Sequence, residues 1–171
     1  MNPTLSTSPR VTYLVLALLA AASPVGAQQR GGTIAQGAPD PCALVTEAEA
    51  GAIAGVPMQH HPMPARTELR NCVYLVKAPS GKNVTGLLVT TYQSIADPSA
   101  LVQQGKTDCG KANFKHESDL GPLTASCVDP EAAQVMGFKG RTGLMVQLGG
   151  SSPELHSLAR RGFGMAMKKL P

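Results

Sequence analysis

Two thioethers and two imidazoles lie close together in one six-residue stretch of the chain. Residues 58–63 read Met-Gln-His-His-Pro-Met. Thioether sulfur is a soft ligand and imidazole a borderline one, so both suit copper in a compartment where thiols are oxidised. The stretch has two interpretations: a proline-containing loop whose side chains bind no metal, or a site for copper or another soft metal. The ligands of such a site would be Met58, His60, His61 and Met63.

Four cysteines form the second group with chemical potential: Cys42, Cys72, Cys109 and Cys127. An even number of cysteines favours two disulfides in an oxidising compartment. No pair has the C-x-x-C spacing that is typical of zinc sites. The sequence permits three pairings of the four residues. We favour Cys42 with Cys72 and Cys109 with Cys127, because each pair would close a local segment of the fold.

The common signatures of hydrolases are absent from the chain. It contains no G-x-S-x-G, no H-E-x-x-H and no S-x-x-K with its companion motifs. Glu117 and Asp119 are spaced as an acid–base pair could be, but their segment is more simply interpreted as the solvated end of a strand. We therefore predict a non-catalytic protein with no catalytic residue and no cofactor other than copper in the metal-binding alternative. An unrecognised small enzyme is the third alternative.

The N-terminal residues predict export. One cation, Arg10, precedes an uncharged apolar run over residues 11–22. About a dozen apolar residues are too few to span a bilayer, which takes roughly 20, but they suit a signal peptide. Small residues favour cleavage after Ala27. No cysteine follows the run at the position where a lipoprotein is acylated, so we expect a periplasmic or secreted product without a stable membrane anchor.

The charge of the mature chain indicates which partners to expect. Removal of residues 1–27 leaves 14 Lys and Arg against 11 Asp and Glu, a net charge of +3. The cations are scattered and are not interleaved with aromatic residues, as a nucleic-acid surface would require. We expect an envelope protein or a small ligand as the partner, and no nucleic acid.

The elements that must position these residues follow a mixed pattern. Residues 28–40 predict a flexible leader, and residues 41–171 predict a single disulfide-tied domain. Thr46 and Glu49 have the spacing of a capping box at a first helix. The expected order is α-β-β-α-β-β-β-α, an α+β fold with an antiparallel sheet packed against helices. Similar sequences at Thr85–Val89 and Thr142–Val146, each followed by a helix, indicate two β-β-α units within this order as a further hypothesis.

Four segments together resemble a group of known families. They are residues 40–55, which open with Asp40-Pro-Cys-Ala-Leu and include the first expected helix, the strand Asn71-Cys-Val-Tyr, the turn Asp119-Leu-Gly-Pro-Leu-Thr-Ala and the segment Val146-Gln-Leu-Gly. They are similar to small bacterial exported proteins and lipoproteins classed as domains of unknown function. The resemblance supports the bond between Cys42 and Cys72 and the α+β order, and it implies no catalytic residue. This chain departs from the families at Pro122, where their turn has Asp, and at Cys127, which belongs to an additional pair.

Overall fold

The computed structural model describes residues 37–63, 69–77, 84–93, 95–110 and 112–171. The chain divides into two units, Met1–Gly32 and Thr33–Pro171, and every described residue belongs to the second. The predicted signal peptide and residues 28–36 of the predicted leader lie outside the described residues. The end of the leader is attached to the domain, because the carbonyls of Ala38 and Pro39 accept hydrogen bonds from Arg70 and Thr91.

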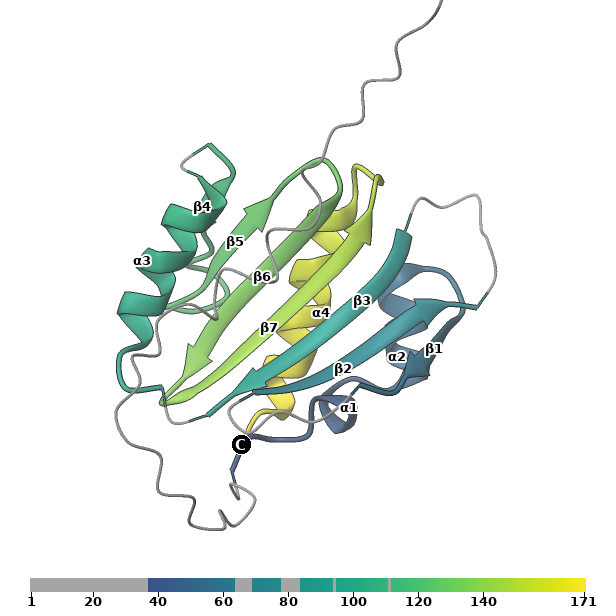
Figure 1. Ribbon diagram of the computed structural model, residues 1–171, viewed down its shortest axis with the longest axis horizontal. Helices are drawn as coiled ribbons and strands as arrows, with labels where there is room; N and C mark the ends of the chain where they lie inside the picture. The colour runs from purple at the N-terminus through teal and green to yellow at the C-terminus, as the bar shows by residue number, and fades with distance from the viewer. Residues whose placement is uncertain (1–36, 64–68, 78–83, 94, 111) are drawn as a thin grey trace, which may run out of the picture. The chain divides into compact units, whose positions relative to one another are not determined.

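A seven-stranded antiparallel sheet forms the centre of this unit (Figure 1). The strand order is β1-β2-β3-β7-β6-β5-β4, so β3 and β7 pair at the centre although more than 40 residues separate them in the chain. Val89 of β3 faces Val146 of β7 in that pair. The strands are β1 (Met58–His61), β2 (Leu69–Val76), β3 (Val84–Tyr92), β4 (Phe114–His116), β5 (Ala125–Val128), β6 (Ala132–Lys139) and β7 (Thr142–Gly150).

Helices pack on both faces of the sheet, but unequally. Helices α1 (Pro41–Leu44), α2 (Glu47–Ala54) and α4 (Leu155–Lys169) cover one face, and the main core lies beneath them (Figure 1). Cross-strand neighbours on this face are fully buried; they include Cys72, Val89, Val135 and Val146. Helix α3 (Pro98–Cys109) packs on the opposite face, near β4 and β5, and its single buried residue is Val102.

Short-range hydrogen bonds mark the starts of α2 and α3. The Thr46 hydroxyl accepts the Glu49 N–H, and the Glu49 carboxylate accepts the Thr46 N–H at 2.9 Å, so the predicted capping box is confirmed. Asp97 caps α3 in the same way, through the N–H of Ala100. Gly55 ends α2 in the left-handed conformation, with φ of 68°, which a glycine adopts without strain.

The mixed α+β class is confirmed, but the predicted order of elements is wrong. The observed order is α-α-β-β-β-α-β-β-β-β-α. Asp40 caps a separate short helix that was not expected, and β1 pairs with β2 where the sequence favoured a loop. Four strands rather than three separate α3 from α4. The hairpins β2–β3 and β6–β7 are each followed by a helix, but α3 and α4 lie on opposite faces, so the two segments do not pack as copies of one unit.

Both favoured cysteine pairings are confirmed. Cys42 bonds to Cys72 and ties α1 to β2, and Cys109 bonds to Cys127 and ties the end of α3 to β5. The described residues contain no free cysteine. Two disulfides are typical of proteins in oxidising, non-cytoplasmic compartments. Within the described ranges, no helix combines the length and the apolarity that crossing a membrane requires.

Candidate functional site

The four residues of the predicted Met/His metal site are not brought together. Met58 is 2 % exposed and belongs to the core, whereas Met63 is 47 % exposed and lies beyond the end of β1. His60 and His61 are consecutive residues of a strand, so their side chains point to opposite faces of the sheet. His60 lies instead beside the Cys42–Cys72 disulfide.

A buried carboxylate, Glu117, joins the end of β4 to α4. Its side chain is 1 % exposed, which corrects the expectation that it lies on a solvated strand end. The Ser126 hydroxyl donates to Oε1 at 2.7 Å, and His156 Nε2 lies 2.9 Å from the same atom. Arg160 pairs with the other carboxylate oxygen and also with Asp119, which is 64 % exposed. Sequence analysis missed this cluster, although His156 and Arg160 have the i, i+4 spacing that places two side chains on one helix face.

The geometry of this cluster favours a structural role. Ser126, His156 and Arg160 all interact with Glu117, so the carboxylate has donors on both oxygens and is satisfied within the fold. The Ser126 hydroxyl donates to the carboxylate rather than to a histidine nitrogen. A serine nucleophile needs a base that accepts its proton and a third group that orients this base, and the cluster lacks that sequence of contacts.

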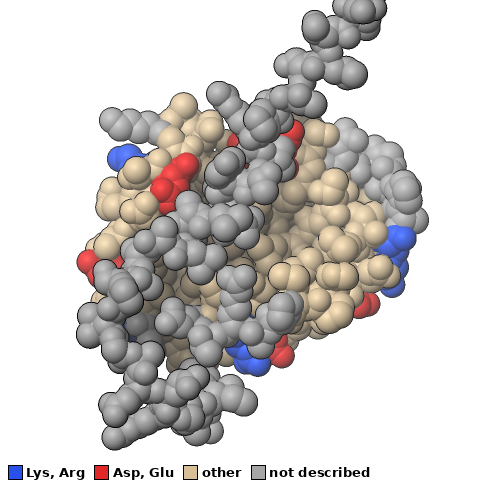
Figure 2. Space-filling view, in the orientation of Figure 1, with Lys and Arg blue, Asp and Glu red and all other residues tan. Residues whose placement is uncertain are grey.

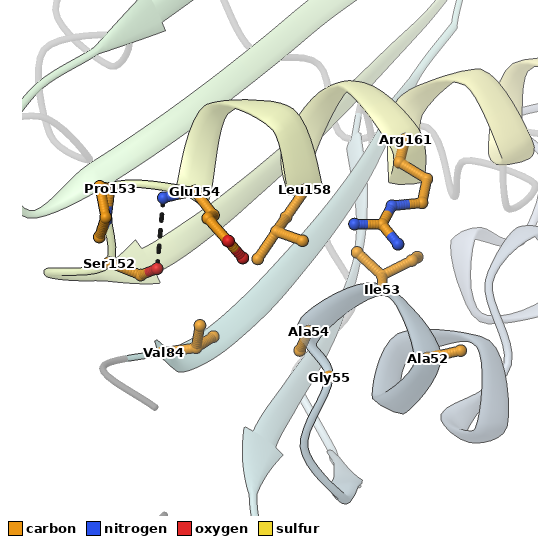
Figure 3. Close-up of a pocket in the computed structure, with 10 residues that line it drawn as sticks. All are labelled: Ala52, Ile53, Ala54, Gly55, Val84, Ser152, Pro153, Glu154, Leu158 and Arg161. Atoms are coloured by element: carbon orange, nitrogen blue, oxygen red, sulfur yellow. Dashed lines mark hydrogen bonds between the residues drawn. The ribbon is translucent and has the colours of Figure 1, made fainter. Parts of the chain in front are cut away.

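A cleft of about 440 Å³ lies between α2 and α4, and it is the strongest candidate for a ligand site (Figure 3). Its floor is apolar: Ile53 of α2, Leu158 of α4 and Val84 at the start of β3 are all buried. The loop before α4 closes one end, where Ser152 Oγ accepts the N–H of Glu154 at 3.3 Å. The remaining lining residues are Ala52, Ala54, Gly55, Pro153 and Arg161.

Two opposite charges project into this cleft, one from Glu154, the N-cap residue of α4, and one from Arg161 within α4. Glu154 and Arg161 are seven residues apart, with Leu158 between them, so all three lie on one face of the helix. Figure 3 shows both charged side chains extending toward α2 over the apolar floor. Within the described residues, neither the carboxylate nor the guanidinium has a hydrogen-bond or ion-pair partner. An unpaired anion and cation above an apolar floor can hold a ligand that supplies the complementary charges.

Two other surfaces are weaker candidates for a ligand site. A neighbouring hollow of about 600 Å³ between α2 and β1 is more open to solvent, and Glu47 and Lys77 lie among its lining residues. The sheet face opposite α4 is largely uncharged over β2 and β3 (Figure 2). Leu75, which is 39 % exposed, points to this face because its neighbour Tyr74 is buried in the main core. An uncharged surface of this kind does not by itself indicate a particular ligand.

Comparisons with known proteins identify no relative of this chain. No protein-family model, no curated protein and no solved structure matches the chain. We therefore base the functional proposal on the cleft between α2 and α4.

Proposed function

We propose that this protein is an exported, non-catalytic binding module whose α2–α4 cleft takes a small amphipathic ligand with an anionic group. One observation carries the proposal: Arg161 and Glu154 face into the cleft above buried apolar side chains, and neither charged group has a partner among the described residues. The two disulfides and the signal-peptide pattern of residues 1–27 support the exported location.

The cleft suggests how such a ligand would be oriented. Its volume of about 440 Å³ lies within the range of roughly 300–1,000 Å³ that small-molecule pockets occupy. The Arg161 guanidinium can donate two parallel hydrogen bonds to a carboxylate. The Glu154 carboxylate can accept from an ammonium group at the other end of the ligand. Seven residues of helix correspond to about 10 Å along the axis, which is close to the length of an extended tripeptide.

Thermal unfolding with the apolar tripeptide Leu-Ala-Leu as the probe tests this proposal. A ligand present at 100 times its dissociation constant stabilises the native state by about 2.7 kcal/mol, so the melting temperature should rise by several degrees. The tripeptide with an amidated C-terminus should bind at least tenfold more weakly, because it lacks the anion that pairs with Arg161.

Two charge-matched variants of α4 provide the control. Arg161→Gln should lose the stabilisation by the tripeptide, whereas Lys168→Gln removes the same charge outside the cleft and should retain it. The proposal is wrong if the tripeptide leaves the melting temperature unchanged, or if both variants respond as the unaltered protein does.

A further inference from the structure

His60 lies next to the Cys42–Cys72 disulfide. One imidazole nitrogen and the two sulfur atoms are all within 4.8 Å of one another. Among the described residues, this is the one group of three His, Cys, Asp or Glu side chains whose ligand atoms come so close. The three residues come from three elements, α1, β1 and β2, so the tertiary fold creates the cluster.

The surroundings hold this cluster in place. The His60 N–H donates to Glu47 Oε1 at 2.8 Å, which links β1 to the start of α2. The His60 ring meets the edge of the Tyr74 ring, with 6.1 Å between the centroids, and the Tyr74 hydroxyl donates to the Val45 carbonyl. Cys72 is fully buried, but Cys42 is only partly buried and His60 is exposed. A soluble reductant and a metal ion can therefore approach from the His60 side.

We propose that reduction of the Cys42–Cys72 disulfide converts this cluster into a Zn²⁺ site with two thiolate ligands and the His60 imidazole. A dithiol supplies the two electrons that break the S–S bond and becomes a disulfide itself, and its two protons pass to the two cysteine sulfurs. Zn²⁺ then binds both sulfurs as thiolates and releases those protons. In the disulfide both sulfurs are bonded to each other, so the oxidised protein lacks the site.

The donor set and its spacing suit zinc. Thiolate and imidazole are the ligands that Zn²⁺ most often takes in proteins, and three protein ligands leave a fourth position for water. With Zn–S of about 2.3 Å and Zn–N of about 2.1 Å, tetrahedral donors lie roughly 3.5 Å apart. On reduction the two sulfurs, bonded to each other in the disulfide, move apart to this spacing, and the imidazole nitrogen approaches them from within 4.8 Å. This site shares only His60 with the predicted Met/His site.

A metal titration of the reduced protein tests the proposal. Cys109→Ala with Cys127→Ala serves as the background, so that the remaining thiols are those of Cys42 and Cys72. After reduction with a dithiol and its removal without oxygen, Co²⁺ should bind one to one and show thiolate-to-cobalt charge-transfer absorption, and Zn²⁺ should displace it. The oxidised protein should show no such absorption.

Two adjacent histidines supply the matched control. His60→Ala should weaken Zn²⁺ binding at least tenfold, whereas His61→Ala, on the opposite face of the strand, should leave it unchanged. If the reduced protein is unfolded without metal, Zn²⁺ should restore the folded circular dichroism, and the same tenfold difference between the variants should appear in the metal concentration required. Equal titrations of the two variants, or equally strong binding by the oxidised protein, would overturn the proposal.

Discussion

At the scale of single residues, Glu117 stabilises the fold by linking the end of β4 and β5 to α4. Its carboxylate interacts with Ser126, His156 and Arg160, and only 1 % of the Glu117 side chain is exposed to solvent. Glu117→Ala leaves the Ser126 hydroxyl without its acceptor and removes one partner of a buried ion pair. We expect the free energy of unfolding to fall by about 3 kcal/mol, measured by urea denaturation. Asp119→Ala should cost less than about 1 kcal/mol, because Asp119 is exposed; similar losses for both variants would contradict a structural role of Glu117.

Glu49 is a second residue whose charge contributes to stability. Its carboxylate pairs with Lys169 and so links α2 to the last residue of α4. The hydrogen bond from Lys169, followed by that from the Thr46 N–H, holds the pKa of the Glu49 carboxyl below its ordinary value. A lowered pKa in the folded state means that the unfolded state binds the proton more readily. The stabilisation of the folded state by the charged Glu49 carboxylate is therefore complete above the pKa of about 4.3 that this group has in the unfolded chain. It is lost as the pH falls through the lower pKa that the group has in the folded protein.

The variant Glu49→Gln tests this pH dependence. It retains the polar groups of the capping box but carries no charge. We expect it to be less stable than the unaltered protein at pH 6 by at most about 1 kcal/mol, since the pair with Lys169 is partly exposed. The difference should shrink toward pH 3 in urea denaturation experiments. A difference that stays constant over this range would show that the charge of Glu49 contributes nothing.

At the scale of elements, two glycines of α4 differ in their surroundings. A Cβ at Gly164 would meet nothing within 4 Å, whereas a Cβ at Gly162 would lie 3.2 Å from Ile53 Cδ1 and 3.3 Å from Val146 Cγ1. Gly164→Ala should raise the free energy of unfolding by about 0.5–1 kcal/mol, because alanine loses less conformational freedom in a helix.

Gly162→Ala is the matched comparison on the same helix. It gains the same helix propensity, but its methyl group must displace the side chains that pack α4 against α2 and β7. We expect its stability to lie at least about 1 kcal/mol below that of Gly164→Ala in urea denaturation. Equal stabilisation by the two substitutions would mean that α4 is packed less closely than the structure shows.

At the scale of the whole molecule, the two disulfides act on different parts. Cys42–Cys72 joins elements that share the main core, but Cys109–Cys127 holds α3, which buries only Val102 and lies on the other face of the sheet. Removing the second disulfide should let α3 open locally while the sheet stays folded.

Amide hydrogen exchange in Cys109→Ala with Cys127→Ala measures this local opening. A disulfide that closes about 18 residues contributes about 3 kcal/mol, so protection in α3 should fall by up to roughly 100-fold, with little change in β3 and β7. The corresponding Cys42→Ala with Cys72→Ala variant should reduce protection throughout the core. Equal losses in α3 and β7 in the first variant would contradict independent opening.

The sequence by itself determined the features that depend on neighbours in the chain. The caps at Thr46 and Asp97 were predictable, because a capping side chain bonds to an amide three residues away. The disulfide pairing was predictable because four cysteines permit few pairings and the favoured pairs close short segments. Strand β1 was not predictable, since its residues become a strand only by pairing with β2.

Only the tertiary structure decided which side chains meet. Glu117 is buried because α4 brings His156 and Arg160 to it from about 40 positions further along the chain. Glu154 and Arg161 acquire an apolar floor because α2 packs beside α4, and His60 meets Cys42 and Cys72 because β1 adds to the edge of the sheet. The physical reason is the same in each case: residue spacing specifies contacts within one element, whereas burial and charge pairing depend on how separate elements pack.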